Sequence, residues 1–457
     1  MNQTLAIKRT KRHLWRKRIK KIKKRKKFEL YLKVFGNQKV SISYEYLLEN
    51  HLPTNLKYLL YNEDCIFYIK NLFKANKRYD GFYKVPETFS IVENPDESYN
   101  FLRDITAALI LQWNREVKID YINCKRLELN AQVLLDIILK DIIAFFKICN
   151  STKKNLSWVV NIGGINVNDE DIKKLLFSVG SPAIHTNKTI HYKDIISYKL
   201  CIHNRDKYKN DVKNKEQKDV DTTKLADYVL DSLKRLNKTL TPEKIDDLCT
   251  IIGEILINAE EHSTTKHRFS IGYFQETNQN NEHFGIFRLV ILNFGKTIYE
   301  KFKDPNCPNQ EIVAKMRDLS HQYTQKRIFK FGVLEEETLW TLYALQEGVT
   351  SISTAQYRKR GNGSIQFIES FFNLKGNEED DKMSKMSILS GKTQIIFDGT
   401  YNISEKNINS ENFKVMTFND SGNIENKPDT KFVKFVPNYF PGTIISARIQ
   451  FKEDEII

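Results

Sequence analysis

The clearest pattern of apolar and polar positions lies between residues 241 and 263. Its apolar residues recur at the three- and four-residue spacing of one helix face, namely Ile245, Leu248, Ile252, Ile255, Leu256 and Ala259. Thr241 and Pro242 stand just before them, and a hydroxyl N-cap followed by proline favours a helix start. The pattern predicts an amphipathic helix that packs its apolar face into a core.

Three further patterns in the second half of the chain predict a strand, a helix and another strand. ILNFGKTI reads as a buried strand at Leu289–Leu292 that breaks at Gly295. RGNGSIQFIESFF, from Arg360 to Phe372, is a glycine-rich turn followed by an apolar-periodic helix. FPGTIISARIQF, from Phe440 to Phe451, is a turn that leads into an alternating strand.

The first half alternates between strand and helix patterns. Two strands are expected at Val117–Cys124 and Leu156–Gly164, and two helices at Asn130–Cys149 and Asp169–Ser178. Units of this length imply a parallel pair of strands joined by a helical crossover. This part of the chain resembles a STAS-like domain, the fold of anti-anti-sigma factors.

Candidate chemistry follows from the polar edge of the helix at 241–263. Glu254, Asn258 and His262 fall four residues apart and form one stripe. A carboxylate, an amide and an imidazole can hold a metal and a water beside a phosphate. The alternative is the polar edge of an ordinary amphipathic helix. The glycines of the turn at 360–364 add to the first interpretation, because they let the backbone and the helix N-terminus approach an anion.

These four motifs, in this order, resemble the GHKL ATPase superfamily, which is named for gyrase, the ninety-kilodalton heat-shock chaperones, histidine kinases and MutL. The resemblance covers about residues 222–453 and is closest to the anti-sigma-factor and stand-alone ATPase branches. It implies a two-layer α/β sandwich that binds ATP and Mg²⁺. The helical segment at about 299–360 would be the lid over the nucleotide.

The resemblance also implies roles for individual residues. Glu254 corresponds to the carboxylate that activates water, and Asn258 to the Mg²⁺ ligand. The remaining residues that the motifs place at the nucleotide are His262, Asn293, Gly295, Thr297, Arg360, Gly361, Asn362, Gly363, Ser364 and Thr443. Gly348–Ser351 resembles the lid sequence of the family.

Two positions depart from the family pattern. Asn293 replaces the adenine-reading Asp, and its amide adds a donor that a carboxylate lacks. Thr297 replaces the second glycine of the DxGxG motif, which leaves less room for the backbone to approach a ligand. Both departures bear on which base is bound and on whether the nucleotide is hydrolysed.

Charge is concentrated at the start of the chain. Residues 1–27 contain 14 Lys and Arg and no acidic residue, so they account for nearly all of the net charge of +15. Such an arm suits nucleic acid, because each cation releases counterions from phosphate. The apolar edge formed by Leu14, Trp15, Ile19 and Ile22 favours the alternative of a protein partner or homodimer. An anionic membrane surface is a third option.

Composition sets the remaining expectations. The chain shows no apolar run of transmembrane length and no signal peptide, which predicts a cytoplasmic protein. Its six scattered cysteines are expected to be reduced thiols. We expect a basic arm at 1–27, a segment without clear motif at 28–84, a STAS-like domain at 85–204, a flexible charged linker at 205–221 and the ATPase domain at 222–457.

The leading functional hypothesis is an Mg²⁺-dependent ATPase that acts as a nucleotide-driven conformational switch. An anti-sigma-type serine/threonine protein kinase acting on a STAS-like partner would use the same site with a different acceptor. A non-hydrolysing nucleotide-binding adaptor is the third hypothesis. The architecture would fit bacterial anti-phage defence or DNA-associated signalling.

Overall fold

The computed structural model describes residues 44–78, 80–113, 116–152, 161–184, 190–207, 211–279, 282–324, 334–351, 363–375, 383–408 and 411–452. The chain divides into two compact units, Met1–Pro53 with Ala144–Trp158, and Thr54–Ile143 with Val159–Ile457. In the first unit, helix α2 (Tyr44–His51) packs Tyr44 edge-on against Phe145 of helix α6 (Leu129–Thr152). The basic arm predicted at 1–27 lies outside the described residues.

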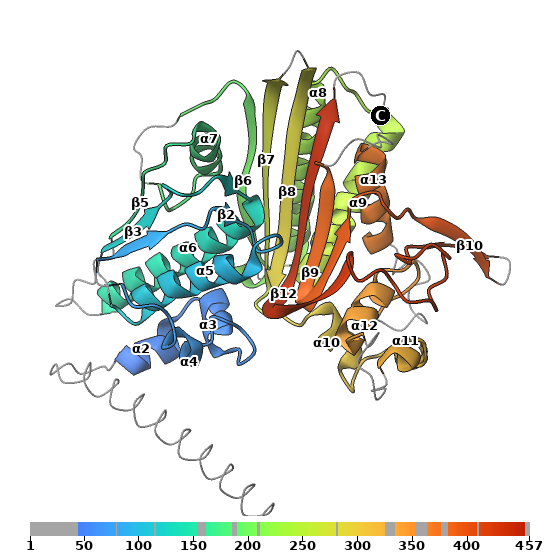
Figure 1. Cartoon of the computed structure of the whole chain (residues 1–457), viewed down its shortest axis with the longest axis horizontal. Coiled ribbons are helices and arrows are strands. Elements are labelled where there is room, and N and C mark those ends of the chain that lie inside the picture. Colours follow the sequence, from blue (N-terminus) through green and yellow to red (C-terminus); the bar gives the residue numbers. More distant parts are fainter. Residues whose placement is uncertain are drawn as a thin grey trace, which may run out of the picture. The chain divides into compact units, whose positions relative to one another are not determined.

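The second unit contains a parallel sheet with the strand order β1-β3-β5 (Figure 1). Its strands are β1 (Phe82–Lys84), β3 (Glu116–Asp120) and β5 (Asn161–Ile165), and both pairings are parallel. The predicted succession of strand, helix, strand and helix is confirmed, with α6 and α7 (Glu170–Val179) as the helices. Asp169 caps α7 by accepting a hydrogen bond from the Ile172 amide at 3.0 Å.

The remaining elements of this region are short or flank the parallel sheet. They are α3 (Thr54–Tyr61), α4 (Ile69–Leu72), β2 (Thr88–Phe89), α5 (Pro95–Ile110) and β4 (Arg126–Leu127). Strands β2 and β4 form a separate parallel pair.

A five-stranded antiparallel sheet forms the larger part of the second unit, in the order β6-β7-β8-β12-β9. The strands are β6 (Ile195–Asn204), β7 (His267–Gln279), β8 (Glu282–Phe294), β9 (Lys385–Phe397) and β12 (Val433–Lys452). The predicted strands around Leu289–Leu292 and Phe440–Phe451 are confirmed as parts of β8 and β12. The sequence placed residues 195–204 in the preceding domain, whereas β6 hydrogen-bonds to β7 in this sheet.

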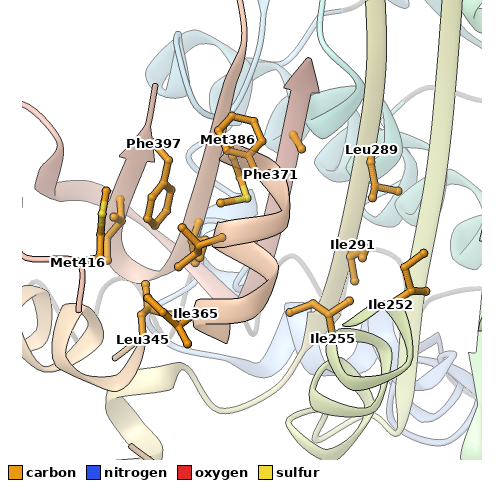
Figure 2. Packing of buried hydrophobic residues seen from close by; sticks show 14 of the residues in the cluster. Ile252, Ile255, Leu289, Ile291, Leu345, Ile365, Phe371, Met386, Phe397 and Met416 are labelled. Carbon is orange, nitrogen blue, oxygen red and sulfur yellow. The ribbon is translucent and has the colours of Figure 1, made fainter. Parts of the chain in front are cut away.

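Helices α8 (Asp211–Lys234), α9 (Pro242–Glu261) and α13 (Gly363–Lys375) pack on the antiparallel sheet. Figure 2 shows Ile252 and Ile255 of α9 facing Ile291 of β8. Ile365 and Phe371 of α13 lie with Met386 and Phe397 of β9 in the same apolar cluster. The predicted helix at 241–263 is confirmed, and Thr241 caps it by accepting from the Lys244 amide at 3.4 Å.

Three helices follow β8, in the segment expected to form a helical lid. They are α10 (Ile298–Lys303), α11 (Gln310–Thr324) and α12 (Glu336–Ala344). Trp340 of α12 is fully buried, and its indole N–H donates to Ser320 of α11 at 3.0 Å. A hairpin of β10 (Ser404–Ile408) and β11 (Glu411–Val415) follows β9.

The expectation of a flexible charged linker at 205–221 was wrong for its second part, because α8 begins at Asp211. The charges of this segment are not all solvated. Asp221 is 1% exposed and ion-pairs with Arg268 of β7 at 2.9 Å. Asn214 is buried, and its side-chain oxygen accepts a hydrogen bond from the ring of His203 at 3.0 Å.

Ion pairs join the parallel region to the antiparallel sheet within the second unit. Glu93 accepts from Arg126 and from Lys385 of β9, each at 2.6 Å. Glu128 pairs with Arg126 at 2.7 Å and with Arg448 of β12 at 3.4 Å. Two carboxylates therefore connect the start of α6 with the two last strands of the sheet.

In the part of the chain that the structure describes, no helix is long and apolar enough to cross a membrane. All six cysteines are free thiols, as the sequence predicts.

Candidate functional site

The polar stripe of α9 borders a cavity of about 270 Å³. Glu254, Asn258 and His262 all line it, because the apolar face of the helix is fixed against β8 and turns the stripe toward the space beside the sheet. His262 is the C-cap of α9, where the helix ends. The helix therefore places a carboxylate, an amide and an imidazole along one wall.

Two neighbouring strands supply the floor of this cavity. Asn293 near the end of β8 is paired in register with Thr443 of β12, and both line the cavity. The Thr443 hydroxyl lies 2.9 Å from the hydroxyl of Ser390 on β9. Asn293 is 2% exposed, and its Nδ2 has no hydrogen-bond partner among the described residues. An amide donor with no partner at the floor of a cavity is available to a ligand.

The N-terminus of α13 borders the cavity next to Glu254. Gly363 and Ser364 line it. A Cβ on Gly363 would lie 2.7 Å from Glu254 Oε2 and 3.1 Å from Asn258 Nδ2, so this position has no room for a side chain while the two polar groups keep their places. The first amides of a helix have no partner within the helix and carry partial positive charge. They therefore lie beside the carboxylate and the amide of α9.

Of the remaining predicted residues, some lie near the cavity without lining it. Gly295 passes so close to the end of α9 that a Cβ would sit 2.5 Å from the His262 carbonyl oxygen. Thr297 caps α10, with its hydroxyl accepting from the Glu300 amide at 3.1 Å and its own amide donating to the Glu300 carboxylate at 2.8 Å. Arg360, Gly361 and Asn362 lie outside the described residues.

The structure also brings residues to the cavity that the sequence motifs did not identify. Lys301 of α10 and Glu261 of α9 are the charged members of this group. Phe367 of α13 lines the cavity as well. Val349, Thr350 and Ser351 also line it, and they belong to the segment that the sequence already marked as similar to a lid. The only sequence signal near Lys301 is the helix cap at Thr297, four residues earlier, which places Lys301 in the first turns of α10.

Burial shifts the proton affinities of two charged groups in the cavity wall. Burial raises the pKa of Glu254 above its usual range, which favours a carboxylate that can take up a proton. Burial also lowers the pKa of Lys301 to about 7, and the negative charge of Glu261 opposes that shift only in part.

A buried ionic cluster, formed by His203, Lys218, Asp221, Glu260 and Arg268, lies on the other side of the last turn of α9. The Arg268 guanidinium is 2.9 Å from Asp221 and 3.9 Å from Glu260. Lys218 approaches Glu260 at 3.1 Å. His203 lies 3.2 Å from Asp221 and 3.4 Å from Glu260. Arg268 is paired in register with Asn293, so the cluster adjoins the cavity floor.

Among the described residues, no group of three His, Cys, Asp or Glu side chains is arranged to hold a metal ion. Asn258 provides an amide oxygen in the cavity, and Mg²⁺ is commonly bound by one or two protein oxygens together with phosphate oxygens and water. The donors present are therefore compatible with a Mg²⁺ ion that a nucleotide brings with it. Comparisons with protein-family models, with curated proteins and with solved structures gave no match.

Proposed function

We propose that this chain is a Mg²⁺-dependent ATPase of the GHKL type, with a two-layer α/β sandwich, and that it works as a nucleotide-driven conformational switch. One observation carries the proposal. Four segments far apart in the sequence, whose motifs resemble the nucleotide site of that superfamily, contribute residues to a single cavity: Glu254, Asn258 and His262, then Asn293, then Gly363 and Ser364, then Thr443.

The residues present fit a nucleotide with its metal. The volume of about 270 Å³ is close to the lower end of the range for small-molecule sites, about 300–1,000 Å³. The Asn293 amide, whose Nδ2 has no partner among the described residues, supports recognition of a base, since it can donate to a ring nitrogen while its oxygen accepts from an amino group. Gly363 has no side chain, so Glu254 and Asn258 can lie next to the first turn of α13, and the N-terminus of a helix favours anions such as phosphate.

Each group of the cavity then has a defined task. Asn258 would hold Mg²⁺, which neutralises charge on the phosphate oxygens when bound. The amides at the start of α13 would bind phosphate oxygens without any change in their own protonation. Glu254, with its raised pKa, would orient a water molecule and accept its proton. Lid closure by the segment that contains Val349–Ser351 would exclude bulk water.

Two features favour the alternative of a nucleotide-binding adaptor that does not hydrolyse. Asn293 replaces a carboxylate of the family motif, and Thr297 is engaged as a helix cap where the family has glycine. Both features concern the base and the first turn of α10, whereas Glu254 and Asn258 are retained. We therefore place hydrolysis first. A protein kinase of the anti-sigma type would use the same residues and deliver the phosphate to a hydroxyl.

The test compares Glu254→Gln with Asp247→Asn, an exposed carboxylate on the same helix outside the cavity. Glu254→Gln should keep Mg·ATP binding in calorimetry and lower phosphate release by about 10²-fold or more, the scale of a lost general base. Asp247→Asn should match the wild type. Asn258→Ala should lose Mg²⁺-dependent binding.

Normal turnover by Glu254→Gln would overturn the assignment of the base. Label transfer from radioactive ATP to a protein without phosphate release would favour the kinase. Binding without either reaction would favour the adaptor.

A further inference from the structure

Lys301 contributes a cationic side chain to the nucleotide cavity at a position outside the family motifs. It lies on α10 between Ile298 and Phe302, which also line the cavity. No carboxylate of the described residues comes within ion-pair distance of its ammonium group. Lysines of the same stretch behave differently, since Lys296 pairs with Asp304 and Lys303 pairs with Glu336.

The charged groups around Lys301 come from several elements. On α9, Glu261 is the carboxylate that acts on it, and Glu254 and His262 line the same cavity. On α12, Glu336 is occupied by Lys303 and Tyr299, and Glu337 accepts from the Lys392 amide of β9 at 2.6 Å. On α10 itself, Glu300 caps its own helix. The carboxylates of α10 and α12 are thus engaged elsewhere.

We infer that Lys301 binds the phosphate chain of the nucleotide, as a second anion-binding element in addition to the N-terminus of α13. The inference rests on the proposed function, and it specifies which part of the ligand this side chain recognises. A partly buried ammonium that forms no ion pair with the described carboxylates gains most from a ligand that brings negative charge, and polyphosphate is the negatively charged part of a nucleotide.

Protonation of Lys301 then enters the binding equilibrium. With a pKa of about 7 in the free protein, the side chain of Lys301 is largely the neutral amine at pH 8. Phosphate favours the charged form and raises this pKa, so binding takes up a proton above pH 7. The affinity for the nucleotide is therefore highest at low pH and falls as the pH rises through about 7. One such group predicts roughly a tenfold loss of affinity between pH 6 and pH 8.

The experiment measures Mg·ADP and adenosine binding by calorimetry for the full chain, Lys301→Met, Lys301→Arg and Lys303→Met. Lys301→Met should weaken Mg·ADP by about tenfold or more at pH 6.5, as expected for a charge-assisted hydrogen bond, and leave adenosine affinity within about twofold. Lys301→Arg keeps a charge that does not titrate in this range, so it should bind Mg·ADP equally at pH 6 and pH 8. Lys303→Met, on the same helix but outside the cavity, should behave as the wild type.

Proton uptake, measured in buffers of different ionisation enthalpy at pH 8, separates Lys301 from His262. Uptake should persist in His262→Gln and disappear in Lys301→Arg. Equal losses for Mg·ADP and adenosine in Lys301→Met, or an unchanged pH profile in Lys301→Arg, would overturn the inference while the proposed function stands. A wild-type protein that binds neither Mg·ATP nor Mg·ADP would overturn both.

Discussion

Replacing Arg268 by methionine should destabilise the second unit through the two carboxylates that this guanidinium contacts. Arg268 is 1% exposed, and its partners Asp221 and Glu260 are 1% and 3% exposed. Removing one partner of a buried ionic pair costs about 3–5 kcal/mol, because the other charge stays buried. Lys218 and His203 remain in contact with the two carboxylates. We therefore expect Arg268→Met to lower the free energy of unfolding by about 3 kcal/mol, the lower end of that range.

The loss should also depend on pH in a defined direction. Burial alone would raise the pKa of Asp221, but hydrogen bonds to His203 and Gln217 and the charge of Arg268 hold that pKa below its usual range. In the wild type this carboxylate stabilises the fold above its unfolded pKa of about 3.9, and the stabilisation is lost as the pH falls through the lower folded value. Without Arg268, burial favours the neutral acid and the pKa of Asp221 rises. Acidification from pH 7 toward pH 4.5 should therefore reduce the difference in the free energy of unfolding between the variant and the wild type.

Urea unfolding, followed by tryptophan fluorescence and circular dichroism, measures both effects. Arg205→Met is the matched control, because Arg205 lies 3.9 Å from the same Glu260 but its side chain is 59% exposed. That change should cost less than about 1 kcal/mol. The double variant Arg268→Met/Asp221→Asn should recover part of the loss. The reasoning is refuted if Arg268→Met lowers the free energy of unfolding no more than Arg205→Met does. It is also refuted if the difference in that free energy between Arg268→Met and the wild type grows on acidification.

Two further predictions concern a glycine beside the cavity and the basic arm. Gly295→Ala should cost about 1–3 kcal/mol in urea unfolding, because its Cβ would meet the backbone of His262 and Thr264, whereas Gly253→Ala on α9, with no atom closer than 3.9 Å, should be neutral or stabilising. Deleting residues 1–27 should leave Mg·ATP turnover intact and greatly weaken nucleic-acid binding, whose affinity in the full chain should fall by nearly one log unit per log unit of salt for each phosphate contact. A changed mass in light scattering with unchanged nucleic-acid binding would instead assign the arm to self-assembly.

Much of the antiparallel-sheet region was predictable because its elements carry local signals. Thr241-Pro242 and the spacing of Leu248, Ile252 and Ile255 identify α9 without any knowledge of its neighbours. The strand register that sets Asn293 beside Thr443 could not be derived, since it depends on residues about 150 positions apart in the chain. The resemblance, rather than the local pattern, brought these two residues together.

The errors have a physical cause as well. The charge run at 205–221 predicts a solvated linker when each side chain is considered alone. The burial of Asp221 is supported by Arg268, which lies 47 positions further along the chain, together with His203 and Gln217. Lys301 could not be predicted as a site residue for the same reason. Its position in the cavity depends on the folded arrangement of α9 and α10 and not on the residues next to it in the sequence.

The buried ionic cluster also limits how this chain can change over evolutionary time. Asp221, Glu260 and Arg268 come from three different elements, and a neutral substitution at any one of them removes a buried ionic partner from the others. Exchanges that preserve folding must therefore occur in combination, for example an apolar residue at 268 together with neutral residues at 221 and 260. Related sequences, when aligned, should show these three positions covarying, while exposed Arg205 drifts independently of them.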